Sequence, residues 1–333
     1  MEIGIGGFPQ EAFTSTHRLL EVCEEVEGFG FDRLWMADSQ GIWPDPYALL
    51  GRLAEMTTGI GLGVGVSNPR TRHPAVLARA SVTLTHLAGE RFVLGIGAGN
   101  TAFLHLGFPP AGVELCGEAV GCIRSLIRGE DGTFGGARVP AFHNYEPVNV
   151  PVYLAANGPK MLSLAGEIAD GAIVSSGISP EILNWVQAQI DQGLKRSGRG
   201  RGDFRLIAFV GCAVSEDRQR ARGEILSWVA RRLSMPLPEE VSGIPKADRL
   251  RALEAYSYTE HYRVRVSHGG VVDSIPDEWV DRFGIAGAPQ ESAERLASLS
   301  SLGVDAVFIL PITEDSHAFL KTFSERLLPR LRR

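Results

Sequence analysis

The chain of 333 residues contains only four cysteines, and they match neither a metal site nor a disulfide framework. Cys23, Cys116, Cys122 and Cys212 include no CxxC pair, and none belongs to a cluster of cysteine and histidine with metal-ligand spacing. Disulfides and a bound metal are therefore not expected. We interpret the four cysteines as small core or surface residues.

Positive charge and long apolar runs are also scarce. The chain has 33 Lys and Arg against 39 Asp and Glu, a net charge of −6 without a basic stripe, which argues against nucleic acid and anionic membranes as main partners. Its apolar runs, such as FVLGIG and AVFIL, have the length of strands, and the N-terminal MEIGIGGFPQ has neither the cationic start nor the apolar core of a signal peptide. We therefore expect a soluble, cytoplasmic protein that acts on a small-molecule substrate and has neither nucleic acid nor a membrane as a partner.

Strand-like runs alternate with amphipathic segments along nearly the whole chain, a pattern typical of βα units around a parallel sheet. The expected strands span residues 2–6, 31–37, 59–66, 92–97, 151–156, 171–176, 204–214 and 304–311. Helices are expected at 12–28, from 45 onwards, at 74–87, 112–127, 159–169 and 180–196, after 214, and from the last strand to the C-terminus. Eight such units predict an α/β protein with a single (β/α)8 TIM-barrel domain over residues 1–333, because a doubly wound sheet ordinarily has fewer strands.

Two segments lack this βα rhythm. Residues 129–150 are rich in glycine and proline, and residues 234–283 contain short helical pieces with several tyrosines and His261. Loops at the C-terminal ends of the strands build the sites of such barrels, so we expect both segments to be insertions at the C-terminal mouth.

The functional residues of a barrel follow its strands, so the strand ends are the informative positions. Asp38 and Ser39 follow the second strand, where Asp38 is either a polar group aimed into the mouth or the N-cap of a short helix. The third strand ends in Gly65, Val66, Ser67 and Asn68. This run either brings the main chain close to a planar ligand or forms a tight turn capped by Asn68.

The ends of the fourth and fifth strands have their own patterns. After the fourth strand come Gly97, Ala98, Gly99 and Asn100, which resemble a nucleotide-binding glycine loop without its GxGxxG register. After the fifth come Ala156, Asn157, Gly158, Pro159, Lys160 and Met161, followed by a strong helical pattern. The helix N-terminus and Lys160 suit a phosphate group, and the alternative is an ordinary βα loop. Arg70, Arg72 and His73 either steer an anionic ligand or form a solvated helix start.

Three segments are more specific in combination than any one motif: GFDRLWMAD, GVSNPRTRHPAVLARASVTLTHLAGERFVLGIGAGN and PVYLAANGPKMLSLAGEIADGAI. They resemble the luciferase-like monooxygenase superfamily, and specifically its branch that uses the 5-deazaflavin coenzyme F420. Within that branch they are similar to the methylenetetrahydromethanopterin reductases. The resemblance covers nearly the whole chain outside 234–283.

The resemblance implies a fold and a set of cofactor contacts. The fold is the bacterial-luciferase-like barrel, with the deazaflavin ring lying at its mouth against Gly65 and Val66, which we expect to be joined by a cis peptide bond. It further implies that Asp38 and Asn68 hydrogen-bond the ring's polar edge or its ribityl chain. Residues 97–100 would line the cofactor channel, and residues 157–161 would hold the phosphate.

The chain also departs from the methanopterin reductase pattern, which has acidic residues at the positions of Gly6 and Asn100 and a histidine at that of Ser39. Of that polar set it keeps Asp38. The candidate catalytic residues are therefore Asp38 and Ser39. The candidates for the proton donor are Ser39, water, and a histidine of an insertion, such as His143 or His261.

The resemblance favours a reductase or dehydrogenase. Such an enzyme transfers a hydride between C5 of coenzyme F420 and a C=N, C=O or activated C=C bond of a small organic substrate, or runs the reverse reaction. A deazaflavin lacks the N5 atom on which oxygen chemistry depends, so monooxygenation is not expected with it. The alternatives are an FMN-dependent monooxygenase of the same fold and a non-catalytic flavin-binding protein. A homodimer is the family expectation.

Overall fold

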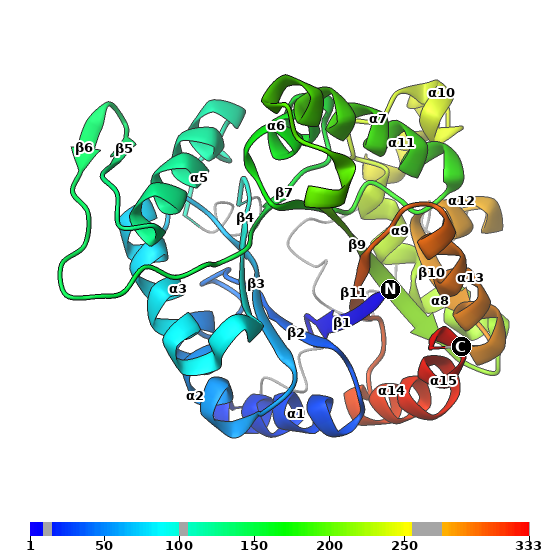
Figure 1. Cartoon of the computed structure of the whole chain (residues 1–333). Coiled ribbons are helices and arrows are strands. Elements are labelled where there is room, and N and C mark those ends of the chain that lie inside the picture. Colours follow the sequence, from blue (N-terminus) through cyan, green and yellow to red (C-terminus); the bar gives the residue numbers. More distant parts are fainter. Residues whose placement is uncertain (9–14, 100–105, 255–274, 333) are drawn as a thin grey trace. The chain divides into compact units, whose positions relative to one another are not determined.

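The computed structural model describes residues 1–8, 15–99, 106–254 and 275–332. All eight predicted barrel strands lie within these residues: β1 (Glu2–Gly6), β2 (Arg33–Met36), β3 (Gly61–Ser67), β4 (Phe92–Ile96), β7 (Val152–Ala155), β8 (Gly171–Val174), β9 (Arg205–Val214) and β11 (Ala306–Pro311). With β10 (Gly284–Gly287) they form one sheet in the order β10-β9-β11-β1-β2-β3-β4-β7-β8, and a further pairing of β9 with β8 closes it. The predicted barrel of eight parallel strands is therefore confirmed (Figure 1).

The helices that follow barrel strands are α1 (Thr16–Gly28), α2 (Pro46–Met56), α3 (Pro74–Ala88), α5 (Val113–Ile127), α6 (Pro159–Ile168), α7 (Pro180–Ser197), α8 (Arg218–Glu224), α9 (Leu226–Arg232), α14 (Ser316–Thr322), a π-helical turn (Phe323–Leu327) and α15 (Leu328–Leu331). The helices α3, α6 and α7 begin at the residues that the sequence pattern predicts, whereas α1 begins at Thr16, four residues after its expected start. Asp45 and His73 cap α2 and α3 through side-chain acceptors, and a proline in the first turn of each pre-sets helical geometry. The sequence did not predict β10, α13 (Pro289–Ser301) or the hairpin of β5 (Gly132–Phe134) and β6 (Ala137–Val139).

The described residues divide into two compact units. The first, which we call the site unit, comprises Asp32–Ile173 and Gln189–Arg205. Its strands β2, β3, β4 and β7 pair in parallel, so their carboxyl ends, where the candidate residues lie, share one edge of the sheet. Trp35 of β2 is almost fully buried, and Gly63 of β3 leaves the space for its indole, because a Cβ there would lie 2.6 Å from Cε3.

The second unit comprises Met1–Phe31, Val174–Ala188 and Leu206–Arg333. Its strands β1, β11, β9 and β10 also pair in parallel. An aromatic cluster packs on β9: the ring of Phe209 lies 4.4 Å from that of Phe308 and 5.2 Å from that of Trp228. The indole Nε1 of Trp228 donates a hydrogen bond to the carbonyl of Phe283 at 2.8 Å, which ties α9 to α12 (Asp277–Phe283).

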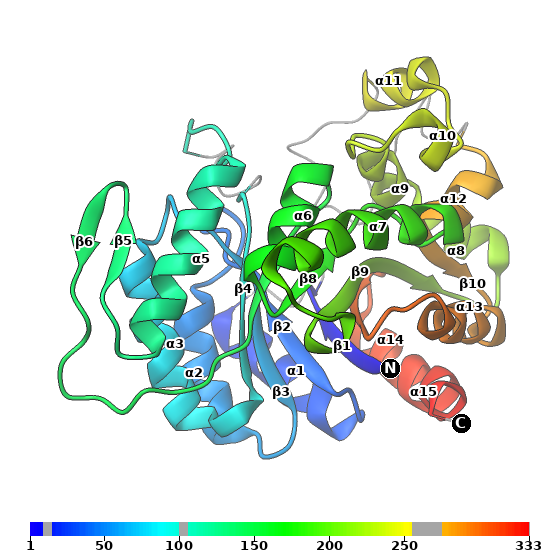
Figure 2. The ribbon, with the colours of Figure 1, turned by 45° about the horizontal axis from the view of Figure 1, so that its top comes forward.

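Residues 129–150 do not lie over the mouth as expected. The hairpin and the strand-free chain after it pack along α3 and α5, on the outer side of these helices (Figure 2). Arg79 of α3 lies between the rings of Phe142 and Tyr145, 4.2 and 5.1 Å from their centres, and the Tyr145 hydroxyl donates to the carbonyl of Leu126. These contacts hold apolar side chains of the segment against the helix surfaces, which corrects the expectation.

The second insertion, 234–283, belongs to the second unit. It contains α10 (Glu239–Ser242), α11 (Lys246–Glu254) and α12, and residues 255–274 lie outside the described part of the chain. Arg249 of α11 donates to the carbonyl of Leu237 at 2.9 Å, which anchors α11 to the chain before α10. The position of this second insertion at the mouth stays a prediction.

Two further sequence expectations concern the cysteines and membrane spans. All four cysteines are free and buried, so their interpretation as core residues is confirmed. Among the described residues, none of the helices has the length and apolar character needed to cross a bilayer.

Candidate functional site

The end of β3 departs from regular strand geometry at the position predicted for the cofactor ring. The peptide bond between Gly65 and Val66 is cis, as predicted, and the pairing of β3 with β4 shifts register at this point. Glycines of β4 and its following loop make room for the bulge. A Cβ at Gly95 would lie 2.9 Å from Cγ1 of Val66, and a Cβ at Gly97 would lie 2.8 Å from Cγ2. At Gly95 the carbonyl oxygen of Val64 would be closer still, so the backbone and side chain of the bulge together account for these two glycines.

Asn68 follows the bulge and is fully buried. Its Oδ1 accepts hydrogen bonds from the backbone N–H groups of Arg70 at 3.2 Å and Thr71 at 2.9 Å, so the predicted turn capped by Asn68 is present. Its Nδ2 has no partner in the part of the chain that the structure describes. An unpaired buried donor costs about 1–3 kcal/mol, so this geometry favours an acceptor supplied by a ligand.

Asp38, which is buried, lies at the centre of a polar network that extends to the exposed Asp45. Its carboxylate accepts hydrogen bonds from Oγ of Ser67 at 2.5 Å and from Nε and Nη2 of Arg72 at 2.8 and 3.2 Å, so both oxygens are engaged. Arg72 also donates to Asp45 at 2.5 Å and lies 4.7 Å from the centre of the Tyr47 ring. The Tyr47 hydroxyl lies 2.8 Å from Oγ of Ser67. We call these five residues the Asp38 network.

The charges of the Asp38 network stabilise one another. Burial opposes the charge of Arg72, but hydrogen bonds and attraction from Asp38 and Asp45 outweigh it and raise the pKa of its guanidinium. Burial also opposes ionisation of Asp45, yet the Arg72 hydrogen bond and two backbone N–H groups of α2 lower the pKa of its carboxyl. Burial raises the pKa of the Tyr47 hydroxyl. At neutral pH, Arg72 is therefore charged and Tyr47 is protonated.

The helix-cap role that the sequence left open for Asp38 belongs to Asp45, which accepts hydrogen bonds from the backbone N–H groups of Tyr47 and Ala48. Ser39, the second catalytic candidate, is only 5% exposed, and its carbonyl accepts hydrogen bonds from the N–H groups of Ile42 and Trp43 at 2.9 Å each. The backbone between β2 and α2 is thus held in a turn.

The loop after β4 is tied to the bulge and to the start of α5. The N–H of Gly97 donates to the carbonyl of Ser67 at 2.8 Å, and the carbonyl of Ala98 accepts from Ala111 at 2.9 Å. Gly99 has a φ of +79°, a left-handed conformation that favours glycine. Asn100 lies outside the described residues.

The end of β7 leads into the predicted phosphate site. The N–H of Ala156 donates to the carbonyl of Ile173 at 3.0 Å, which fixes the strand end, and Asn157 and Met161 are half-buried. Gly158 is the N-cap of α6 and supplies no side-chain acceptor, so the first N–H groups of the helix lack the usual cap. Such an N-terminus, with the positive end of the helix dipole, suits an anion.

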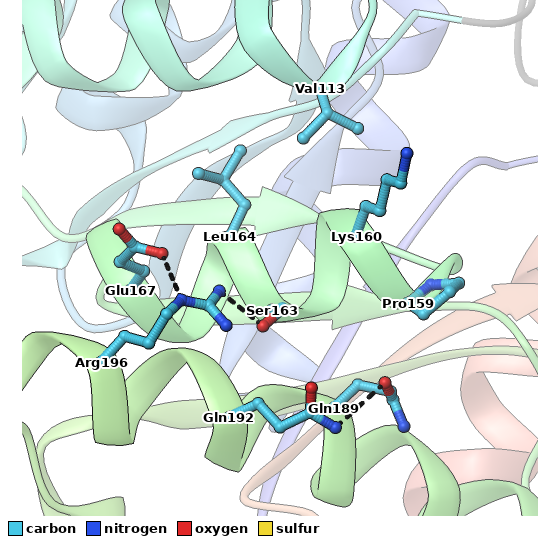
Figure 3. Close-up of a pocket in the computed structure, with 9 residues that line it drawn as sticks. All are labelled: Val113, Pro159, Lys160, Ser163, Leu164, Glu167, Gln189, Gln192 and Arg196. Atoms are coloured by element: carbon cyan, nitrogen blue, oxygen red, sulfur yellow. Dashed lines mark hydrogen bonds and ion pairs between the residues drawn. The ribbon is translucent and has the colours of Figure 1, made fainter.

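A surface trough of about 400 Å3 runs over α6, with residues of α5 and α7 along its sides (Figure 3). Its lining comprises Val113, Pro159, Lys160, Ser163, Leu164, Glu167, Gln189, Gln192 and Arg196. Arg196 is bound to Glu167 at 3.0 Å and to Ser163 at 2.7 Å, so its charge is already paired. Lys160 is exposed, lies toward the other end of the trough, and makes no ion pair within the described residues.

The structure brings most of the sequence-predicted positions together at one edge of the site unit. A Cβ at Gly97 would lie 3.0 Å from Cβ of Ala155, so the bulge, the loop after β4 and the end of β7 are neighbours. Asp38 reaches the same edge through Ser67. His143 does not, because its carbonyl accepts from Arg79 on the outer side of α3, which removes it from the proton-donor candidates. His261 lies outside the described residues.

Sequence reasoning missed Tyr47 and Asp45, and it predicted that Arg72 either steers an anionic ligand or belongs to a solvated helix start. Tyr47 meets Ser67, Arg72 meets Asp38 and Asp45 meets Arg72 only through space, across 20 to 34 positions of the chain. The signal that could have indicated them is an arginine directly before the α3 cap, facing a strand end that carries a buried aspartate.

Comparison with known proteins places these features in a family context. A family model described as Luciferase-like monooxygenase matches residues 4–306. The chain is 32% identical to a 5,10-methylenetetrahydromethanopterin reductase of Archaeoglobus fulgidus, with 100% of each chain covered. It is 30% identical to an F420-dependent glucose-6-phosphate dehydrogenase of Beutenbergia cavernae, with 92% of this chain and 91% of that protein covered.

Solved structures share the fold. The coenzyme F420 dependent tetrahydromethanopterin reductase of Methanopyrus kandleri matches with a TM-score of 0.83 and 23% identity, covering 99% of both chains. An F420-dependent secondary alcohol dehydrogenase, in complex with an F420-acetone adduct, matches with a TM-score of 0.77 and 18% identity, covering 100% of this chain and 99% of that one.

Proposed function

Because the chain belongs to the luciferase-like monooxygenase family, we propose that it is an F420-dependent oxidoreductase that transfers a hydride between the deazaflavin C5 atom and a small organic substrate. The observation that carries this proposal is likeness over more than nine-tenths of the chain, at 30% identity or more, to a methylenetetrahydromethanopterin reductase and an F420-dependent dehydrogenase. These relatives favour coenzyme F420 over the FMN alternative. They also favour an enzyme over a non-catalytic flavin-binding protein.

The residues at the strand ends fit such a coenzyme. A planar ring would lie against Val66 and the cis peptide, with the unpaired Nδ2 of Asn68 donating to an oxygen or nitrogen on its polar edge. Gly97, Ala98, Gly99 and Asn100 would line the channel, where the lack of side-chain bulk leaves room for the ribityl chain. Ala156, Asn157, Gly158, Pro159, Lys160 and Met161 would hold the phosphate, because the N-terminus of α6 has no side-chain cap.

The bound coenzyme would supply or accept the hydride at its C5 atom. The residues of this chain bind and orient the coenzyme. Asn68 and Asp38 are 0% and 6% exposed, so water is excluded from both. Reduction of a C=O, C=N or C=C bond also needs a proton, and we assign the donor role to the hydroxyl of Ser39 or to a water that it holds. Ser39 lies one residue after Asp38 at the end of the same strand.

The test is a spectroscopic assay of purified protein with oxidised coenzyme F420 and a panel of alcohols and sugar phosphates, and with the reduced coenzyme and a panel of ketones, imines and enones. The expected result is a substrate-dependent change in the coenzyme's visible absorbance in at least one series. Turnover with reduced FMN and dioxygen, without any reaction of coenzyme F420, would contradict the proposal.

We further propose that residues 1–333 act as one barrel domain, in the cytoplasm and as a homodimer. Support for a single domain comes from the uninterrupted family match and from a relative covered over its full length. Light scattering of the purified protein tests the dimer, since it returns either twice the chain mass of 36.0 kDa or that mass itself.

A further inference from the structure

The geometry of Asp38 differs from that of a residue that exchanges a proton with substrate. Ser67 and Arg72 together occupy both oxygens of its carboxylate. A general acid or base must instead present an oxygen to the reacting group. The sequence alone could not reveal this, because Ser67 and Arg72 lie 29 and 34 positions away.

The hydrogen bonds of the Asp38 network run in one direction. Ser67 has a single hydroxyl proton, and it is donated to Asp38 at 2.5 Å. In the contact of 2.8 Å between Ser67 and Tyr47, the tyrosine hydroxyl is therefore the donor. Asp38 is the acceptor at the end of this chain, so its negative charge fixes the orientation of both hydroxyls.

Arg72 closes the network on its other side. It donates to Asp38 from Nε and Nη2 and to Asp45 from Nη2, and its Cζ lies over the Tyr47 ring, 4.7 Å from the ring centre. Arg72 is also the residue at which the turn begun by Asn68 ends, since its N–H donates to the Asn68 carbonyl at 3.4 Å. Asp38 therefore holds the segment 67–72 at both ends, through Ser67 and through Arg72.

Between these two anchors lies Asn68, with its unpaired Nδ2, and directly before them lies the cis peptide of Val66. We propose that Asp38 is a positioning residue: through Ser67 and Arg72 it fixes residues 65–72 in the conformation that presents Val66 and Nδ2 of Asn68 to the coenzyme. This inference rests on the proposed function, because it assigns to that segment the binding of coenzyme F420. Proton transfer to the substrate then belongs to another group.

The experiment compares Asp38→Asn, Arg72→Gln and the double variant with the wild-type protein. Asp38→Asn keeps the shape of the side chain and removes its charge, and Arg72→Gln removes the partner that spans both carboxylates. Two quantities are measured: the Kd for oxidised coenzyme F420, by titration, and the hydrogen exchange of backbone amides in residues 70–72, on the unliganded protein. The second does not require coenzyme binding.

We expect each single variant to raise the Kd about ten-fold or more and to speed amide exchange in residues 70–72. We expect the double variant to be no worse than the stronger single variant, because both changes break the same network. Unchanged Kd and exchange in Asp38→Asn would overturn the proposal, and so would losses that add in the double variant.

Asp170→Asn is the matched control. Asp170 accepts a hydrogen bond from Arg124 at 2.6 Å in the same unit, in an ion pair away from the bulge. This variant is expected to lower stability and to leave both measured quantities unchanged. If the wild-type protein does not bind coenzyme F420, the proposed function fails, whereas the exchange rates still decide whether Asp38 positions the segment.

Discussion

Gly97→Ala tests whether the glycine after β4 is required by the bulge of β3. A Cβ at this position would lie 2.8 Å from Cγ2 of Val66 and 3.0 Å from Cβ of Ala155, both closer than ordinary van der Waals contact. Neither neighbour can rotate away, since Val66 is β-branched and Ala155 has no further side chain. Overpacking of this kind costs about 1–3 kcal/mol of stability.

The expected shift in melting temperature follows from the size of the chain. Unfolding entropy is about 2.1 cal/mol/K per residue, so a loss of about 1–3 kcal/mol in a chain of 333 residues lowers Tm by about 1.5–4 °C. Scanning calorimetry of the unliganded protein measures this shift. The coenzyme's affinity is expected to fall as well, because a displaced Val66 no longer supports the ring.

A second substitution distinguishes this clash from a general defect. Val66→Ala removes both Cγ atoms and with them the clash. The double variant with Gly97→Ala is therefore expected to lose less stability than the two single variants lose together, by about 1 kcal/mol or more. Gly121→Ala in α5 is the control, since nothing lies within 4 Å of its Cβ position and alanine favours helix. Additive losses in the double variant would refute the reasoning.

Four further predictions concern the coenzyme contacts and the thiols. Asn68→Ser keeps an acceptor for the turn but removes Nδ2, so calorimetric titration is expected to give about three- to ten-fold weaker coenzyme binding, and unchanged binding would contradict the role of Nδ2. Lys160→Ala is expected to weaken binding of the intact coenzyme more than binding of a phosphate-free ring fragment, and equal losses of affinity would exclude a phosphate role for Lys160. Burial raises the pKa of all four cysteines, to about 12 for Cys23 and Cys212, to about 11 for Cys116 and in the same direction for Cys122, so a thiol reagent at neutral pH is expected to label only unfolded protein. Unfolded thiols ionise near pH 9 while these remain protonated, so urea titrations are expected to give a free energy of unfolding that falls as pH rises from 9 to 12; a constant value would contradict this.

The fold could be predicted from the sequence because each barrel strand is a short apolar run with an amphipathic helix after it. Gly284–Gly287 escaped prediction because a four-residue strand of glycine, isoleucine and alanine shows no alternation. The segment 129–150 was recognised as an insertion but misplaced, since composition does not reveal which surface Phe142 and Tyr145 pack against. Here that surface is α3, through Arg79.

The site could be predicted in part. Family resemblance, and not physical reasoning from spacing, indicated the cis bond at Gly65-Val66. The same resemblance suggested Asn68 as a ligand, while the Asx turn that leaves its Nδ2 unpaired is visible only in the structure. The role of Asp38 depended on Arg72 and Ser67, whose contacts with it are set by the pairing of β2 with β3. The sequence offers an arginine before the α3 cap as a signal, but its spacing does not specify which aspartate that arginine contacts.

The central claim is that this chain binds a deazaflavin at the carboxyl ends of β3, β4 and β7. The most direct measurement is a calorimetric titration of purified protein with coenzyme F420 and with FMN, each in its oxidised and reduced form, repeated with Asn68→Ser. We predict tight binding of coenzyme F420, much weaker binding of FMN, and a selective loss of coenzyme F420 affinity in the variant. Tight binding of FMN alone, or coenzyme F420 binding that Asn68→Ser leaves unchanged, would contradict the claim.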